Sequence, residues 1–72
     1  MAKLRIAIAG AGYFSRFQLE GWKCMADVEM VALCNRSEEK ARTSAATYGV
    51  PRTYASLERM LEESKPDLLD II

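Results

Sequence analysis

The stretch Arg5-Ile-Ala-Ile-Ala-Gly10-Ala-Gly12-Tyr-Phe-Ser15 decides the fold, because an apolar strand runs directly into a glycine-rich turn that opens a helix. Gly10 permits a sharp turn, and Gly12 lacks the side chain that would keep phosphate oxygens away from the backbone. The free N–H groups of the first helical turn point at an anion, and the helix dipole adds to the attraction. The stretch therefore predicts a loop that binds the pyrophosphate of a nucleotide.

The loop departs from the G-x-G-x-x-G pattern at its third position, where Ser15 replaces glycine. Ser15 fits a close helix–strand contact less easily than glycine, but its hydroxyl is able to reach a phosphate, and both roles stay open. The backbone N–H groups of Tyr13 and Phe14 are the expected donors to the pyrophosphate. The Phe14 side chain is expected in the core, whereas Tyr13 lies either over the cofactor or in solvent.

Length and charge restrict the class of protein. The 72 residues are enough for one small domain. Ten basic residues balance ten acidic ones, so the composition favours neither nucleic acid nor a membrane surface as a partner. The chain has no apolar run of about 18 residues and no secretory signal before Gly10, so we expect a soluble cytoplasmic protein.

Histidine is absent, which removes the most common general base. Cys24 and Cys34 do not form a C-x-x-C pair, so the side chains offer too few ligands for a zinc site, and no metal is expected. Both thiols are expected to be reduced, one near a helix end and one in a buried strand.

Strands are expected at residues 3–9, 28–34, 53–55 and 67–72. The intervening helices are expected at about 13–25, from Ser37 to about 48, and from Ser56 to about 65. Gly49 and the proline that follows it end the second helix. On the first helix, the residues expected to face inward are Phe14, Phe17, Trp22 and Met25, and Gly21 allows close approach. On the second they are Ala41, Ala45 and Tyr48, and on the third Leu57, Met60 and Leu61.

This alternation predicts an α/β fold with a parallel, doubly wound sheet, in which four strands take the order 3-2-1-4 beside three helices. Residues 1–72 then form the N-terminal half of a dinucleotide-binding domain. The first two helices cover one face and the short third helix covers the other. Apolar side chains are left exposed behind strands one and four, with an unpaired edge at 68–72, so we expect a homodimer or a domain-swapped assembly.

Asn35, Arg36 and Ser37 follow the second strand, where NAD-selective folds carry an acidic residue. Asp27 and Glu29 lie at the opposite end of that strand. Neutral Asn35 does not repel a ribose 2′-phosphate, Arg36 offers a planar fork to its oxygens, and Ser37 adds a hydroxyl. The run favours NADP over NAD. In the alternative interpretation Ser37 only caps a helix, Arg36 is solvated, and Asn35 binds the ribose.

Over its whole length the chain resembles the N-terminal region of the Gfo/Idh/MocA family of oxidoreductases, which includes glucose–fructose oxidoreductase and inositol dehydrogenase. The matching pieces are Ile6-Ala-Ile-Ala-Gly10-Ala-Gly12, Val31-Ala-Leu-Cys-Asn35-Arg36-Ser37 with Lys40-Ala41, Tyr48-Gly-Val-Pro51, Tyr54-Ala-Ser-Leu57 and Lys65-Pro-Asp-Leu-Leu-Asp-Ile-Ile72. The resemblance implies a Rossmann domain of an NAD(P)-dependent enzyme that moves hydride between the cofactor and a sugar, cyclitol or related alcohol. It also implies a C-terminal substrate domain, which these residues do not include.

The family's pattern differs from this chain at two positions, since members usually have glycine at Ser15 and often histidine at Gln18. The family's catalytic lysine lies in a Glu-Lys-Pro motif after the fourth strand. Ser64-Lys65-Pro66 precedes that strand, so Lys65 is not given the role, and no residue here is assigned a catalytic function. The fragment alone is not expected to be catalytic.

Two other functions stay open. One is a non-catalytic binding or oligomerisation module that has lost the cofactor. Ser15 is mild evidence for this module, and Gly10 and Gly12 are evidence against it. The other is a redox or metabolite sensor with the same fold, for which no residue is distinctive.

Overall fold

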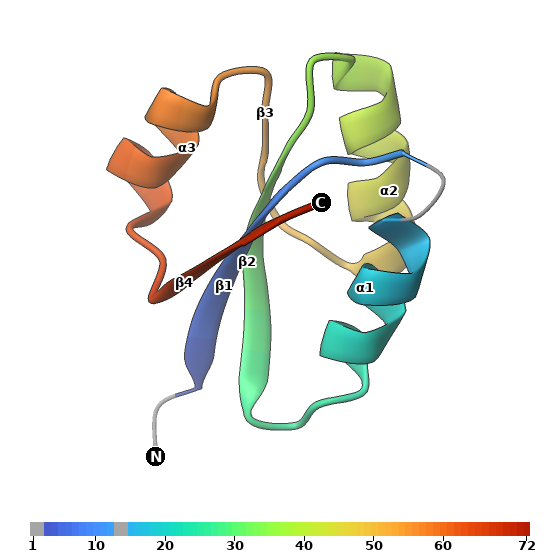
Figure 1. Cartoon of the computed structure of the whole chain (residues 1–72), viewed down its shortest axis with the longest axis vertical. Coiled ribbons are helices and arrows are strands. Elements are labelled where there is room, and N and C mark those ends of the chain that lie inside the picture. Colours follow the sequence, from blue (N-terminus) through green and yellow to red (C-terminus); the bar gives the residue numbers. More distant parts are fainter. Residues whose placement is uncertain (1–2, 13–14) are drawn as a thin grey trace.

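The chain folds into a four-stranded parallel sheet with helices on both faces (Figure 1), as a computed structural model of residues 3–12 and 15–72 shows. The sheet order is β3-β2-β1-β4, and every neighbouring pair is parallel. The predicted fold class, strand order and number of helices are confirmed. The elements in chain order are β1 (Leu4–Ala9), α1 (Ser15–Lys23), β2 (Val28–Cys34), α2 (Glu38–Tyr48), β3 (Thr53–Tyr54), α3 (Leu57–Ser64) and β4 (Leu68–Ile71).

The two faces of the sheet carry separate cores. Helices α1 and α2 lie on one side of the sheet and α3 lies on the other (Figure 1), as the sequence predicts. The buried residues under α1 and α2 are Ile6, Ile8, Ala11, Leu19, Met30, Leu33, Ala45 and Val50. Those under α3 are Ala7, Val31, Ala32, Cys34 and Met60. Since β1 and β2 contribute to both cores, they are buried on both faces, as central parallel strands usually are.

Strand β2 contains one extra residue relative to β1. Ile6 pairs with Met30, but the next residue, Ala7, pairs with Ala32, so no residue of β1 pairs with Val31. This β-bulge places Val31 and Ala32 in the same core, under α3. A strand that is apolar on both faces has no alternation of side chains to reveal such an insertion, and the sequence did not predict it.

The predicted inward face of α1 is wrong in part. Phe17 is 60% exposed and Met25, beyond the helix end, is 51% exposed, whereas Leu19 is fully buried and Trp22 is half-buried. A Cβ on Gly21 would meet no described heavy atom within 4 Å, so this glycine does not serve a close approach. Leu19 and Trp22 follow Ser15, the first helical residue, by one and two turns, so the three share one side of the helix. Phe17 lies on the opposite side.

The predicted helix boundaries around α2 and α3 are confirmed. Ser37 Oγ accepts a hydrogen bond from Lys40 N at 3.3 Å, and Ser56 caps α3 in the same way. Gly49 ends α2 in the left-handed conformation, with φ of 72°. On α3, Met60 is buried as predicted, but Leu57 is exposed because it is the first helical residue, beside the cap.

The C-terminal end of α3 is capped from another element. Arg5 on β1 donates from Nη1 to Lys65 O at 2.8 Å and from Nη2 to Ser64 O at 2.6 Å. The backbone N–H of Arg5 also donates to Asp67 Oδ2 at 2.9 Å. A cation satisfies carbonyls that the helix leaves without partners, so Arg5 fixes the turn that leads into β4.

Within residues 3–12 and 15–72, none of the helices combines the length and the apolar character that crossing a bilayer requires.

Candidate functional site

Gly10 forms the turn at the carboxyl end of β1. Its N–H donates to Cys34 O at 2.8 Å, and its φ is 126°, a conformation that favours glycine. A Cβ at this position would lie 3.1 Å from Ile72 O and 3.3 Å from Ile72 Cβ. The glycine is therefore required twice, by its backbone conformation and by the chain that follows β4.

Gly12 has a different environment. The residue is exposed, and a Cβ there would meet no heavy atom of the described residues within 4 Å. Packing within that part of the chain does not explain a glycine here. No heavy atom within residues 3–12 and 15–72 occupies the space beside Gly12.

Ser15 begins α1 and is 1% exposed. Its Oγ donates to Gly12 O at 2.6 Å, and its backbone N–H reaches the same carbonyl at 3.1 Å. The single hydroxyl proton is thus used on the loop carbonyl, and the two roles left open by the sequence, at a helix–strand contact or on a phosphate, stay predictions. Tyr13 and Phe14, the expected pyrophosphate donors, lie outside the described residues, and their roles stay predictions.

The run after β2 is placed beside this loop, because Gly10 bonds to the last residue of β2. Asn35 is half-buried, with its N–H on Tyr54 O at 3.1 Å and its Nδ2 on Ser37 O at 3.4 Å. Ser37 is the N-cap of α2, and Arg36 is exposed. The capping role of Ser37 in the alternative interpretation is thus present, while its hydroxyl keeps capacity for a second partner.

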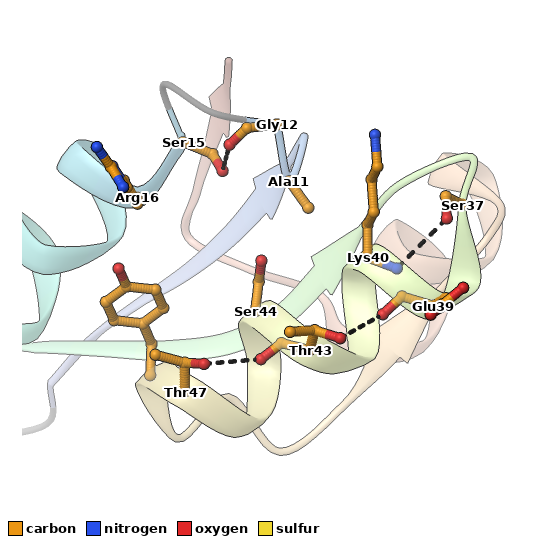
Figure 2. A pocket seen from close by; sticks show the side chains of 11 residues that line it. Ala11, Gly12, Ser15, Arg16, Ser37, Glu39, Lys40, Thr43, Ser44 and Thr47 are labelled. Carbon is orange, nitrogen blue, oxygen red and sulfur yellow. Dashed lines mark hydrogen bonds between the residues drawn. The ribbon is translucent and has the colours of Figure 1, made fainter.

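A pocket of about 540 Å³ lies between the start of α1 and the side of α2 (Figure 2). Its lining residues are Ala11, Gly12, Ser15, Arg16, Ser37, Glu39, Lys40, Thr43, Ser44, Thr47 and Tyr48. Three of the predicted site residues therefore share one pocket: Gly12, Ser15 and Ser37. Gly10, Asn35 and Arg36 do not line it.

The α2 side of the pocket was not predicted. Lys40, Ser44 and Tyr48 are spaced four apart and so lie on one face of the helix. Figure 2 shows Ser44 pointing toward the loop, while the hydroxyls of Thr43 and Thr47 are bonded to helix carbonyls at 2.9 Å. Ser44 is thus the hydroxyl that α2 directs toward Gly12. The i, i+4 spacing was the signal available in the sequence.

Charge in the pocket is mixed with a positive excess. Arg16 and Lys40 bring two positive charges, and Glu39 brings one negative charge near Ser37 (Figure 2). Arg16 also lies over the Phe17 ring, 5.1 Å from its centroid. This balance suits an anion that enters from the loop side, away from Glu39.

The cysteines offer no reactive centre at the site. Both are free, with Cys24 exposed and Cys34 buried. Burial raises the pKa of the Cys34 thiol, so this group stays protonated and unreactive near neutral pH. The described ranges 3–12 and 15–72 hold no cluster of three acidic, cysteine or histidine side chains able to bind a metal.

Known proteins are similar to this chain in sequence and in fold. A sequence model of the oxidoreductase family with an NAD-binding Rossmann fold, Gfo/Idh/MocA, matches residues 4–72. D-apiose dehydrogenase from Paraburkholderia graminis is 35% identical over 65 residues, which are 90% of this chain and 17% of that enzyme. 4-Carboxy-2-hydroxymuconate-6-semialdehyde dehydrogenase from a Sphingobium species is 38% identical over 64 residues, 89% of this chain and 20% of that enzyme.

A crystal structure of the WlbA dehydrogenase from Chromobacterium violaceum, in complex with NADH and UDP-GlcNAcA, has the same fold, with a TM-score of 0.91 at 22% identity. The match covers 99% of this chain and 21% of that one. The chain therefore spans about a fifth of the length of the relatives it matches. Together with the glycine-rich turn at the end of β1, these findings show that the chain belongs to the Gfo/Idh/MocA oxidoreductase family and forms part of its NAD-binding Rossmann fold.

Proposed function

We propose that residues 1–72 bind the pyrophosphate and adenosine ribose of a nicotinamide dinucleotide, as the N-terminal half of a cofactor domain. The observation that supports this proposal is that no atom of the described residues crowds a Cβ at Gly12, which follows β1. In the order β3-β2-β1-β4, β1 is the strand at which the sheet's winding reverses. Ligands of open α/β sheets bind at that switch point, outside the carboxyl ends of the strands.

The residues proposed to hold the cofactor are those predicted from the sequence: Gly10, Gly12, Tyr13, Phe14, Ser15, Asn35, Arg36 and Ser37. Gly10 shapes the turn, and Ser15 holds the start of α1 against the loop through Gly12. Backbone N–H groups of the loop would bind the pyrophosphate. Arg36 and Ser37 would receive the ribose, with Lys40 of α2 beside them.

We also propose NADP as the preferred cofactor. No carboxylate stands directly after β2, where Asn35 and the exposed Arg36 are found, and Lys40 adds a second cation nearby. Glu39, which also lines the pocket, would repel the 2′-phosphate because both are negatively charged. The preference is therefore set by a balance of charges that single substitutions can shift.

For the whole protein we propose a dehydrogenase acting on a sugar, cyclitol or related alcohol, in which these residues supply cofactor binding and a further domain supplies substrate binding and the catalytic groups. The support is the family and the activities named for its relatives, one of which oxidises the sugar D-apiose. Free Cys24 and Cys34 fit a reducing compartment, which supports a cytoplasmic location.

The test of cofactor binding is calorimetric titration of the chain with NADPH and NADH, with Gly12→Ala as the variant. Alanine has room at Gly12, so the free energy of unfolding should stay within about 0.5 kcal/mol. Affinity should fall about tenfold, because the methyl group stands where the phosphate approaches and a charge-assisted hydrogen bond is lost.

Gly21→Ala is the matched control, since it adds the same methyl group to open space on α1 away from the loop. It should stabilise the chain by roughly 0.5–1 kcal/mol and leave affinity unchanged. Absence of heat with either cofactor at millimolar concentration would instead favour a module that does not bind dinucleotides.

The cofactor preference is tested with Arg36→Asp, which should lower the ratio of NADPH to NADH affinity about fivefold, an effect moderated by the exposure of this side chain. Glu39→Gln should move the ratio in the opposite direction. Arg42→Asp makes the same charge change on an exposed α2 residue outside this pocket and controls for net charge. If Arg36→Asp and Arg42→Asp lower the ratio of NADPH to NADH affinity equally, Arg36 has no specific role in the preference.

A further inference from the structure

We propose that Trp22 and Asp70 form a positioning pair that holds residues 10–12, the described part of the glycine-rich loop, in the geometry required for dinucleotide binding, without touching the dinucleotide. This inference rests on the proposed function of the loop. It concerns two residues, one on α1 and one on β4, for which no binding role was predicted.

The pair is joined by a short hydrogen bond. Trp22 Nε1 donates to Asp70 Oδ2 at 2.7 Å, across 48 residues of sequence. Both side chains are half-buried, and the Trp22 ring packs against the core under α1 and α2. A carboxylate acceptor strengthens the bond, and partial burial protects it from water.

The location of Asp70 in the sheet shows why it needs a partner. It pairs with Ile8 at the centre of β4, in the otherwise apolar run 68–72. Leu69, its neighbour, packs in the core under α3, so Asp70 faces the α1 layer. A charge on that face is unfavourable unless a donor meets it, and the Trp22 indole is that donor.

Both elements of the pair adjoin the loop. Two residues beyond Asp70, Ile72 N–H donates to Ala9 O at 2.9 Å, and the Ile72 backbone packs against Gly10. On the other side, Ser15 begins α1 and binds Gly12 O. The loop therefore lies between the end of β4 and the start of α1.

A bond between α1 and β4 limits how far these two elements separate, and so limits the conformations of the loop between them. Loss of the bond lowers the fraction of molecules whose loop is ready to bind. The apparent dissociation constant rises in inverse proportion to that fraction.

Three variants test the pair by titration with NADPH. Trp22→Phe keeps an aromatic ring in the core but removes the N–H, and Asp70→Leu removes the acceptor; each should weaken binding about fivefold. Asp70→Asn keeps an acceptor oxygen and should restore affinity to within about twofold. The double variant Trp22→Phe/Asp70→Leu should be no weaker than either single variant, because both remove one bond.

Hydrogen exchange provides the second readout and needs no cofactor. In Trp22→Phe, the Gly10 and Ile72 amides, which bond to Cys34 O and Ala9 O, should exchange faster relative to the α3 amides. Val50→Ala is the matched control, because it removes buried carbon from the same core beyond the far end of α2. It should lower global stability without changing NADPH affinity or the relative exchange of Gly10.

Unchanged affinity in Trp22→Phe, or an equal loss of affinity in Val50→Ala, would overturn the proposal by reducing the bond to general stabilisation. If the unmodified chain binds neither NADPH nor NADH, the proposed function fails, and the exchange experiment still decides the structural part. Faster exchange at Gly10 in Trp22→Phe then supports the coupling of the pair to the loop, and unchanged exchange overturns it.

Discussion

At the scale of single residues, the two glycines of one motif serve separate purposes. Gly10 has a positive φ and lies against Ile72, whereas a Cβ on Gly12 would meet no heavy atom of the described residues within 4 Å. Both glycines lie between β1 and α1, as predicted, because a glycine pair between a strand and a helix is a local pattern. The Ile72 contact could not be predicted, because it depends on the pairing of β4 with β1.

Gly10→Ala should lower the free energy of unfolding by about 1–3 kcal/mol, because alanine is strained at this φ and its methyl group crowds the Ile72 backbone. Urea denaturation measures the change. Gly49→Ala is the control, since Gly49 also has positive φ but a Cβ there would meet open space. Its smaller loss, about 1 kcal/mol, isolates the backbone term. Equal losses at the two glycines would show that the Ile72 contact has no energetic role.

The proposed binding residues differ in the same way. Asn35, Arg36 and Ser37 could be predicted from the sequence because their proposed role depends only on their position directly after a strand. Lys40 and Ser44 reach the pocket only because α2 packs beside α1, and that packing is not visible in either segment alone.

At the scale of elements, local signals predicted the boundaries well. The bounds of β2 were predicted to the residue, and serine caps and Gly49 marked the helix ends. The inward face of α1 was predicted only in part, because Trp22 packs on the core as expected, whereas Leu19 was missed and Phe17 is exposed. A short helix with large apolar residues on its outer side misleads any analysis of periodicity.

The end of α3 carries a residue in an unfavourable conformation. Lys65 is the helix C-cap with φ of 45°, where a side chain is strained. Lys65→Gly should raise the free energy of unfolding by roughly 0.5–1 kcal/mol, since glycine relieves a penalty of about 1–2 kcal/mol and adds freedom to the unfolded chain. Thermal denaturation measures it. Glu62→Gly, in the interior of the same helix, should instead destabilise by about 1 kcal/mol. A loss of stability in Lys65→Gly would mean that the lysine side chain stabilises the turn.

At the scale of the whole molecule, the edge of β4 is the exposed flank of the sheet. β4 pairs with β1 on one side, and Ile71 is 72% exposed, with Leu68 and Ile72 also exposed. We propose that this edge joins a second copy, as a dimer or through exchange of β4. Light scattering at micromolar concentration should give a dimer mass for the unmodified chain.

One substitution and its control test whether the edge of β4 forms the contact between the two copies. Leu68→Lys should yield a monomer, because a charge on an edge strand prevents strand pairing. Leu57→Lys makes the same change at an exposed site on α3 and should leave the dimer intact. A monomer mass for the unmodified chain would contradict the proposal directly.

The extra residue in β2 has a consequence for the cofactor end of the sheet. A strand normally changes sides with every residue, but Val31 and Ala32 lie on the same side, so the bulge absorbs the extra residue and the alternation resumes after it. Leu33 therefore enters the layer beneath α1 and α2, and Cys34 enters the layer beneath α3. Deleting Val31 would leave this register unchanged, whereas a regular strand that kept Val31 would exchange the two side chains and turn the Cys34 sulfhydryl toward α1 and α2. The side from which the chain leaves β2 toward Asn35, the proposed ribose contact, is thus set by the bulge four residues upstream, inside the sheet.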